Sequence, residues 1–216
     1  MGKSYSNVSM AIIRRLPKYY EYLKQLIDKN IDRISSKELS RMIGFTPSQI
    51  RQDLNKFGGF GQQGYGYNVE VLYGEIEKIL GLNQSYSIVV VGAGSLGQGI
   101  VNHIDFENCG FDLKALFDIK YKFMGKKIKG APIFYIDELQ KFISENHIDI
   151  GVICMPEEFV QDTANKLIES GVSAIWNFSP IDLDAPEGVI VENMNLNNGL
   201  LTLSYFVSNS GKDQVK

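Results

Sequence analysis

The stretch IVVVGAGSLGQGI, residues Ile88–Ile100, is a run of apolar β-forming residues that breaks at three glycines and resumes as a helix pattern. Gly92, Gly94 and Gly97 form a G-x-G-x-x-G turn, in which the backbone can approach a pyrophosphate held at the N-terminus of the helix. The next predicted strand ends in Asp118, twenty-one residues past Gly97. A carboxylate at this place accepts hydrogen bonds from the hydroxyls of the adenosine ribose and repels a 2′-phosphate, so the pattern favours NAD(H) over NADP(H).

The chain around this turn alternates between predicted strands and helices. After the turn the strands are DLKALFDI, APIFYI, IDIGVICM and VSAIWNF, and the helices are DELQKFISEN and PEEFVQDTANKLIESG. This order predicts an α/β domain with a doubly wound parallel sheet, whose ligand lies at the carboxyl ends of the strands. We expect the cofactor-binding residues to be Gly92, Ala93, Gly94, Ser95, Leu96, Gly97, Asp118, Pro156, Asn177 and Phe178. Ordinary packing at a strand end is an equal alternative for Phe178.

The same region lacks the residues that a dehydrogenase needs. Such an enzyme places an acid or base beside the nicotinamide, whereas His103 falls late in a predicted helix and His147 in a loop. About forty residues follow Asn177, too few for a separate substrate domain. Cys109 and Cys154 are too few for a disulfide framework or a zinc cluster, and their apolar neighbours predict buried thiols. We therefore expect a detector of the cofactor, with no catalytic residue and no metal.

Composition and charge limit the class of protein. Hydrophobic residues make up 44% and charged residues 22% of the 216 residues, as in globular domains and unlike disordered chains. The sequence shows no apolar run of about 20 residues and no signal-peptide pattern, which predicts a cytoplasmic protein with no membrane partner. Residues 1–67 carry eleven Lys/Arg against five Asp/Glu, although the whole chain has a net charge of −3. A basic first third predicts contact with a polyanion, and uneven surface charge is the alternative.

The basic first third contains the pattern of a helix-turn-helix. An amphipathic helix is predicted to begin at Pro17. In the next segment, SSKELSRMIG, Ser35 and Glu38 form a capping box and Gly44 ends the helix. In FTPSQIRQDLNKFGG, Thr46 is the N-cap and two glycines end a second short helix. Such a pair places its second helix in the major groove of DNA. A small helical domain that does not bind DNA is the alternative.

The second of these helices carries the predicted DNA contacts. Its exposed face should present Ser48, Gln49, Arg51, Gln52, Asn55 and Lys56, while Ile50, Leu54 and Phe57 pack inward. Arginine and lysine suit guanine edges or phosphates, and glutamine suits adenine. The segment FGQQGYGYNVEVL has the turn chemistry of a hairpin, which would lie as a wing along the DNA backbone or minor groove. A linker helix is predicted over Tyr73–Gly81.

The last predicted helix, NLNNGLLTLSYFV in residues 195–207, presents an apolar surface too broad for a solvated tail. A second copy of the chain would cover it, and a symmetric dimer would suit a palindromic DNA site. We therefore divide the chain into three parts. Residues 1–80 form a winged-helix DNA-binding domain with its linker helix, residues 81–194 a Rossmann NAD(H)-binding domain, and residues 195–216 a C-terminal helix and tail.

Several of these segments together resemble one protein family. They are I-R-Q-D-L (residues 50–54), F-G-G-F-G (57–61), G-Y-G-Y (64–67), the glycine turn, N-F-S-P (177–180) and V-E-N-M-N-L (191–196). On these motifs the chain resembles, over nearly its whole length, the redox-sensing transcriptional repressors called Rex. The resemblance implies a homodimer that represses fermentation and respiration genes at an inverted-repeat operator and leaves the DNA when NADH replaces NAD+. It also implies that the last helix is exchanged between subunits. The implied DNA-binding residues are Arg15, Ser48, Gln49, Arg51, Gln52, Lys56, Phe57, Gln62, Gln63, Gly64 and Tyr65.

The chain departs from the family pattern at three positions implied to form the redox switch. The family has an arginine in the first helix, a tyrosine after the glycine turn and an aspartate before the last helix; this chain has Glu21, His103 and Asn195. Leu196 completes the set of switch candidates. Glu21 and Asn195 cannot form an arginine–aspartate pair, because neither is a cation. We expect that dinucleotide binding survives and that its coupling to DNA release is altered, with protonation or hydrogen bonding at His103 as a substitute route.

The predicted DNA surface departs as well. Gln52 stands where the family has a lysine, and Gln62–Gln63 stand where its wing tip is basic. Each lost phosphate contact lowers affinity and its salt dependence. Two alternatives to a redox-sensing repressor therefore remain: a nucleotide-binding protein with altered or lost redox coupling, and an NAD-dependent oxidoreductase.

Overall fold

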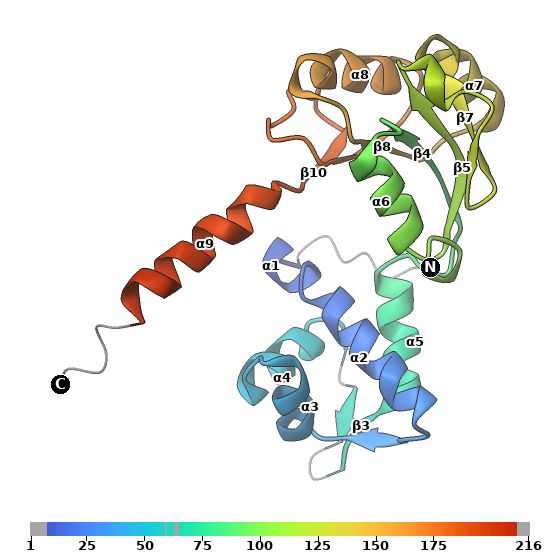
Figure 1. Ribbon diagram of the computed structural model, residues 1–216. Coiled ribbons are helices and arrows are strands. Elements are labelled where there is room, and N and C mark those ends of the chain that lie inside the picture. The colour runs from blue at the N-terminus through green and yellow to red at the C-terminus, as the bar shows by residue number, and fades with distance from the viewer. Residues whose placement is uncertain (1–7, 59, 63–64, 211–216) are drawn as a thin grey trace. The chain divides into compact units, whose positions relative to one another are not determined.

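The computed structural model describes residues 8–58, 60–62 and 65–210, and the chain divides into two units. The first unit spans Met1–Gln84 and the second Ser85–Lys216 (Figure 1). The buried residues form one core cluster in the first unit and two in the second. Within the described ranges, no helix has the length and apolarity needed to span a bilayer.

The first unit is a helical bundle with a small antiparallel sheet. Its elements are α1 (Met10–Ile13), α2 (Leu16–Asp28), β1 (Arg33–Ile34), α3 (Ser36–Ile43), α4 (Pro47–Asn55), β2 (Gly61–Gln62), β3 (Gly66–Asn68) and α5 (Val69–Ile79). The strands lie in the order β1-β3-β2, and the β2–β3 pair is the predicted hairpin. Strand β1 was not predicted from the sequence; it pairs Arg33 with Asn68 and Ile34 with Tyr67.

The helix-turn-helix of α3 and α4 has the predicted start and stop signals. Glu38 Oε2 accepts from the backbone N–H and the hydroxyl of Ser35 at 2.9 and 2.7 Å, and Ser35 Oγ accepts from the N–H of Glu38 at 3.1 Å. Gly44 ends α3 with a φ of +78°, a conformation that residues with a Cβ rarely adopt. Thr46 Oγ1 accepts from the N–H of Gln49 at 3.2 Å and caps α4.

The linker helix starts earlier than predicted. The segment NVEVL was expected in the hairpin, but Asn68 Oδ1 accepts from the N–H of Val71 at 2.9 Å and caps α5. The helix therefore begins at Val69 rather than Tyr73. It packs on α2, where the rings of Tyr20 and Tyr73 stack with centroids 4.5 Å apart.

The second unit is built on one long sheet. Its elements are β4 (Tyr86–Val91), α6 (Ser95–His103), η1 (Glu107–Cys109), β5 (Phe111–Asp118), η2 (Tyr121–Phe123), β6 (Lys127–Ile128), β7 (Ala131–Tyr135), η3 (Ile136–Glu138), α7 (Leu139–Asn146), β8 (Ile150–Ile153), α8 (Glu157–Glu169), β9 (Ala174–Asn177), β10 (Ile190–Asn193) and α9 (Leu196–Asn209). The strand order is β10-β9-β8-β4-β5-β7-β6, and every pairing is parallel except that of β6 with β7. The predicted doubly wound sheet is confirmed, while β6 and β10 were missed.

Helices cover both faces of this sheet (Figure 1). Alternate residues of β4 point to opposite faces: Val89 and Val91 belong to the core cluster with α7 and α8, and Val90 belongs to the cluster with α6. Burying each such side chain contributes about 1.5–3 kcal/mol. Because β4 lies between β5 and β8, the chain leaves the sheet on opposite sides at this point. Such a switch point opens a crevice at the carboxyl ends of the strands.

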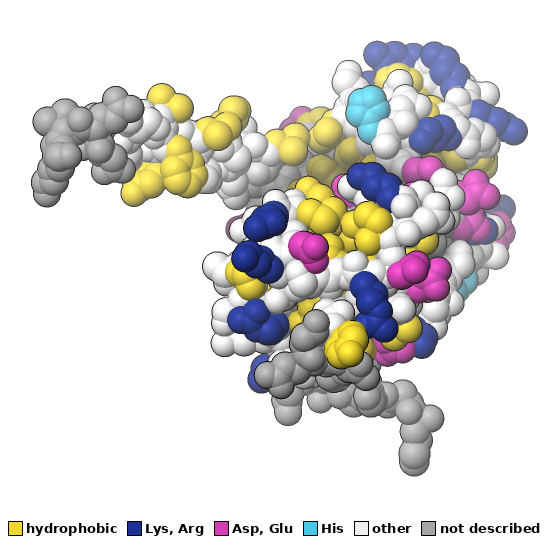
Figure 2. All heavy atoms as spheres, turned by 90° about the horizontal axis from the view of Figure 1, so that it is seen from below, with side chains coloured by type: hydrophobic (Ala, Val, Ile, Leu, Met, Phe, Trp, Pro, Cys, Tyr) yellow, Lys and Arg dark blue, Asp and Glu magenta, His cyan; other side chains and the backbone are white. Residues whose placement is uncertain are grey.

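Helix α9 stands apart from this packing, because none of its residues is buried. Hydrophobic side chains lie along it in the space-filling view (Figure 2). The large exposed ones are Leu196, Leu200, Leu201, Leu203, Tyr205, Phe206 and Val207. The predicted broad apolar surface is present in the structure.

Candidate functional sites

The glycine turn is shaped by close backbone packing. A Cβ on Gly92, whose φ is +109°, would overlap the carbonyl of Cys154, and a Cβ on Gly97 would overlap the carbonyl oxygen of Gly92. The N-cap of α6, Gly94, has no side-chain capping bond in the described chain. The first amides of α6 are therefore available to an anion, as a pyrophosphate site requires.

Asp118 closes the turn from the neighbouring strand. It is 4% exposed, and its two carboxylate oxygens accept from the backbone N–H groups of Ala93 and Lys120, each at 2.7 Å. A carboxylate oxygen can accept a second hydrogen bond. Asp118 therefore holds the turn in place and keeps acceptor capacity for the ribose hydroxyls of a dinucleotide.

A cavity of about 240 Å³ lies at this edge of the sheet. The predicted residues that line it are Gly92, Gly94, Ser95, Leu96, Asp118 and Pro156, together with Ile119, Lys120, Cys154 and Met155. Ala93 and Gly97 are buried. These four additional residues lie next to predicted positions at the ends of β5 and β8. Extending the prediction to every residue that follows these two strands would have included them.

Asn177 lies at the same edge, but its side chain is used within the protein. Its Nδ2 donates to Ile181 O at 2.7 Å and to Asn193 Oδ1 at 2.8 Å, and its Oδ1 accepts twice from Ser179. These four bonds fill the capacity of an amide, so the side chain has no free donor or acceptor here, and cofactor binding at Asn177 stays a prediction. Phe178 packs on Trp176, with ring centroids 4.5 Å apart, which favours the packing alternative.

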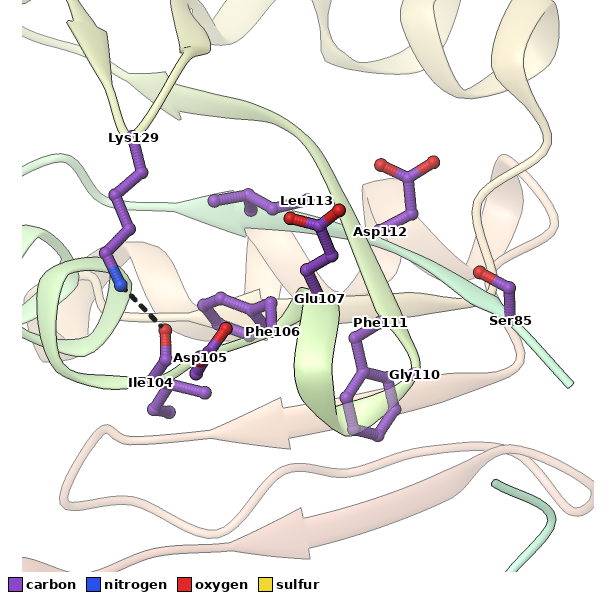
Figure 3. A pocket seen from close by; sticks show the side chains of 10 residues that line it. All are labelled: Ser85, Ile104, Asp105, Phe106, Glu107, Gly110, Phe111, Asp112, Leu113 and Lys129. Atoms are coloured by element: carbon purple, nitrogen blue, oxygen red, sulfur yellow. Dashed lines mark hydrogen bonds between the residues drawn. The ribbon is translucent and has the colours of Figure 1, made fainter. Parts of the chain in front are cut away.

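A larger cavity, of about 720 Å³, lies at the opposite ends of the strands. Figure 3 shows the carboxylates of Asp105, Glu107 and Asp112 around it, with Lys129 Nζ donating to Ile104 O at 3.1 Å. It contains neither the glycine turn nor a free helix N-terminus, and its three carboxylates would repel a pyrophosphate. The features expected of a dinucleotide site therefore lie at the smaller cavity and not at the larger one.

The face of α4 presents most of the predicted DNA contacts. Ser48, Arg51, Gln52 and Lys56 are exposed and Gln49 is half-buried. Arg51 Nη1 donates to Ser36 Oγ at 3.0 Å, which holds the guanidinium beside α3. Phe57 is only 3% exposed, and its side chain packs in the core, as the helical pattern indicated, so the structure gives no support to a DNA contact by its ring.

The wing is described only in part. Tyr65 is 70% exposed, and the Arg33 guanidinium lies 5.9 Å from the centre of its ring. Gln62 belongs to β2, and Gln63 and Gly64 lie outside the described residues. Arg15, predicted as a DNA contact, binds Asp53 through two hydrogen bonds of 2.7 Å.

Comparisons with known proteins match these two parts. A family model described as "CoA binding domain" matches residues 83–181, and one described as "Putative DNA-binding protein N-terminus" matches residues 7–55. The redox-sensing transcriptional repressor Rex of Clostridium novyi (strain NT) is 56% identical over 202 residues, which cover 94% of this chain and 96% of that protein. The Rex protein of Clostridioides difficile (strain 630) is 57% identical over 93% of this chain and 96% of its own. The chain belongs to the Rex family.

Solved structures agree with this placement among Rex proteins. A crystal structure of RSP in complex with beta-NAD+ and operator DNA is 51% identical, with a TM-score of 0.88 over 95% of this chain and 94% of that one. RSP, described as a Rex-family repressor, was also solved with beta-NADH, at 47% identity and a TM-score of 0.87 over 97% of this chain and 99% of that one.

The switch candidates of this Rex chain lie on three different helices. Glu21 is exposed on α2 and His103 is exposed at the end of α6. Asn195 Oδ1 accepts from the N–H of Asn197 at 3.0 Å and caps α9, and Leu196 is 61% exposed. Within the described part of the second unit, none of the hydrogen bonds or ion pairs found joins His103 to Asn195.

The two cysteines differ in their exposure. Cys109 is exposed on η1, so the expectation that both thiols are buried is wrong for this residue. Cys154 lies at the end of β8, and burial raises the pKa of its thiol to about 12. A thiol of this pKa stays protonated near neutral pH and reacts slowly with oxidants.

Proposed function

We propose that this Rex chain is a redox-sensing transcriptional repressor that binds an inverted-repeat operator as a homodimer and responds to NADH and NAD+. Support comes from both sites in one chain: the exposed face of α4 and the cavity at the glycine turn. The observation that carries the proposal is the 51% identity to RSP over 95% of this chain, because RSP is a protein solved with operator DNA and beta-NAD+. The similar proteins are named as repressors, which leaves the oxidoreductase alternative without support.

The homodimer is proposed from the two apolar faces of α9. At 3.6 residues per turn, Leu196, Leu200, Leu203 and Val207 lie along one side of the helix, and Leu201 and Tyr205 lie almost opposite. All six are exposed. One covering surface would leave the other face in water, so the helix needs partners on two sides. Exchange of α9 between two copies, with the helix inserted into the partner, supplies both.

The redox response is proposed to be weaker than in a protein with an arginine–aspartate switch. Glu21 and Asn195 cannot form that ion pair, so an energy difference between the NADH-bound and NAD+-bound states must come from other contacts. A ligand shifts a conformational equilibrium only as far as its affinities for the two states differ. We expect both dinucleotides to bind, with NADH releasing DNA incompletely.

The deciding experiment is fluorescence anisotropy of a labelled duplex that carries the operator DNA of the RSP complex. The protein is titrated first, and then NADH or NAD+ is added. Binding followed by partial release with NADH supports the whole proposal, whereas full release with a strong NADH preference contradicts the weakened switch. Binding that ignores both cofactors supports only the DNA-binding role, and absence of operator binding overturns the proposal.

Arg51 is expected to contribute to base recognition in this assay. Its guanidinium is exposed on α4, held by Ser36, and suited to a guanine edge. Replacing Arg51 by alanine should cost about 1–3 kcal/mol in operator binding and relax base choice at one position. Competition with operators mutated at single positions measures this. A loss that is equal for every sequence would reassign Arg51 to a phosphate.

A further inference from the structure

A partly buried ion pair joins α4 to the rest of the first unit. Asp53 lies on the inner side of α4 and is 2% exposed. Its Oδ2 accepts from Arg15 Nε and its Oδ1 from Arg15 Nη2, both at 2.7 Å. The hydroxyl of Tyr19, which is fully buried, donates to Asp53 Oδ2 at 2.9 Å. Three hydrogen bonds from α2 and its N-cap therefore end on one carboxylate of α4.

We propose that Arg15 and Asp53 are positioning residues for operator recognition, and that their ion pair fixes the rotation and depth of α4 against α2. The inference rests on the proposed DNA-binding function. It gives Arg15 a role different from the direct DNA contact predicted from the sequence, and it gives Asp53, a carboxylate behind a DNA-binding surface, a favourable effect on binding.

The geometry of the pair supports this role. Ile50 and Leu54, the buried apolar residues of α4, pack without a strong directional preference. Two parallel hydrogen bonds between a guanidinium and a carboxylate do fix direction, because both groups are planar. Helix α4 has only nine residues, so a small rotation would displace every base-reading side chain on its outer face.

The pair also holds the turn that precedes α4. Phe45 lies in this turn, with its ring centre 5.7 Å from that of Tyr19 and 5.9 Å from Arg15 Cζ. Burial and the bond to Asp53 raise the pKa of Tyr19, so its hydroxyl remains a donor. The residues that bind Asp53 thus also contact the turn. Their contacts hold α4 at its start and along its inner side.

A buried ion pair is weak evidence for stability, because desolvation offsets much of the attraction between the charges. The Arg15–Asp53 pair contributes instead by fixing the orientation of α4 against α2. The pair should therefore affect specific binding more than non-specific binding, since only specific binding requires base-reading side chains to sit at fixed positions in the groove.

The test uses the full chain with Arg15→Lys, Asp53→Asn and Arg15→Gln. Each is titrated against the operator DNA of the RSP complex and against a scrambled duplex of equal length, at several salt concentrations. Arg15→Lys keeps the charge but loses the planar fork, and Asp53→Asn keeps the shape. Lys24→Gln, which removes a cation and an exposed ion pair with Asp28 from the same helix, is the matched control.

We expect Arg15→Lys and Asp53→Asn each to lower operator affinity about tenfold or more, because both lose the paired hydrogen bonds. Binding to the scrambled duplex should change less than about twofold, and the slope of affinity against salt should not change, since no phosphate contact is lost. Arg15→Gln combined with Asp53→Asn should lose no more than either change alone, because the residues act as one unit.

Other outcomes overturn the proposal. If Arg15 is a phosphate contact, Arg15→Lys stays close to wild type, Arg15→Gln weakens both duplexes and lowers the salt slope by about one, and Asp53→Asn binds more tightly because a negative charge is removed. If Asp53→Asn does not fold, Arg15→Lys decides alone, and unfolding of both would show a structural role only. Failure of the wild type to bind the operator would instead refute the proposed function.

Discussion

Removal of residues 195–216 is expected to convert the protein from a dimer into a monomer. This segment contains α9, whose large apolar side chains are all exposed within the chain, and the proposed dimer buries them in the partner. A monomer contacts only one half of a palindromic operator. Loss of bivalent binding should lower operator affinity about 100-fold or more. Sedimentation velocity and the anisotropy assay measure the two effects.

Two substitution variants separate the loss of α9 contacts from the loss of chain length. Leu200→Glu combined with Leu203→Glu places charge on one apolar face and should also give a monomer. Ser204→Glu, which adds charge on the side of the helix between the two apolar faces, should remain a dimer. A truncated protein that still sediments as a dimer would show that the interface lies elsewhere.

Gly97→Ala is expected to abolish dinucleotide binding. The added Cβ would overlap the carbonyl oxygen of Gly92, and both atoms are bonded to backbone that β4 and α6 hold in place. Relieving this overlap must open the turn, at a cost above about 3 kcal/mol. The open turn would no longer present the first amides of α6 to a pyrophosphate. Calorimetry with NADH and with NAD+ measures the loss, and thermal unfolding measures the destabilisation.

Gly99→Ala is the matched control on the same helix. No atom lies within 4 Å of a Cβ built on Gly99, and its φ is not positive. This change should leave NADH affinity unaltered and raise stability by roughly 0.4–1 kcal/mol, because alanine loses less entropy on helix formation. If Gly97→Ala bound NADH as tightly as wild type, the glycine turn would not be the cofactor site.

Features built from residues close together in the chain could be predicted from the sequence. The capping box of Ser35 and Glu38, the stop at Gly44 and the glycine turn involve residues close together in the chain, and all three were predicted. Strand β10 has four residues and follows a long loop, so only its pairing with β9 defines it. Short strands of this kind carry no periodicity from which to predict them.

Features that depend on distant residues were harder to predict. Asp53 is a charged residue on the inner side of a helix, and it is stable there because Arg15, 38 residues earlier, reaches it. No sequence pattern near Asp53 predicts that Arg15 is its partner. Asn177 was placed at the correct edge of the sheet, but its hydrogen bonds to Ile181 and Asn193 depend on how the following loop folds back.

Within the described residues, helix α9 is attached to the sheet at one end only, so a small tilt at this junction moves its far end by a larger distance. Strand β10 lies at the edge of the sheet, and α9 begins at Leu196, three residues after β10 ends at Asn193. At this junction Met194 N–H donates to Asn177 O at 2.7 Å. A helix of 14 residues is about 21 Å long. A tilt of about 10° at this junction would displace the far end by about 4 Å. A small shift of the backbone at Asn177, at the carboxyl edge of the sheet, would therefore become a larger displacement at the far end of α9.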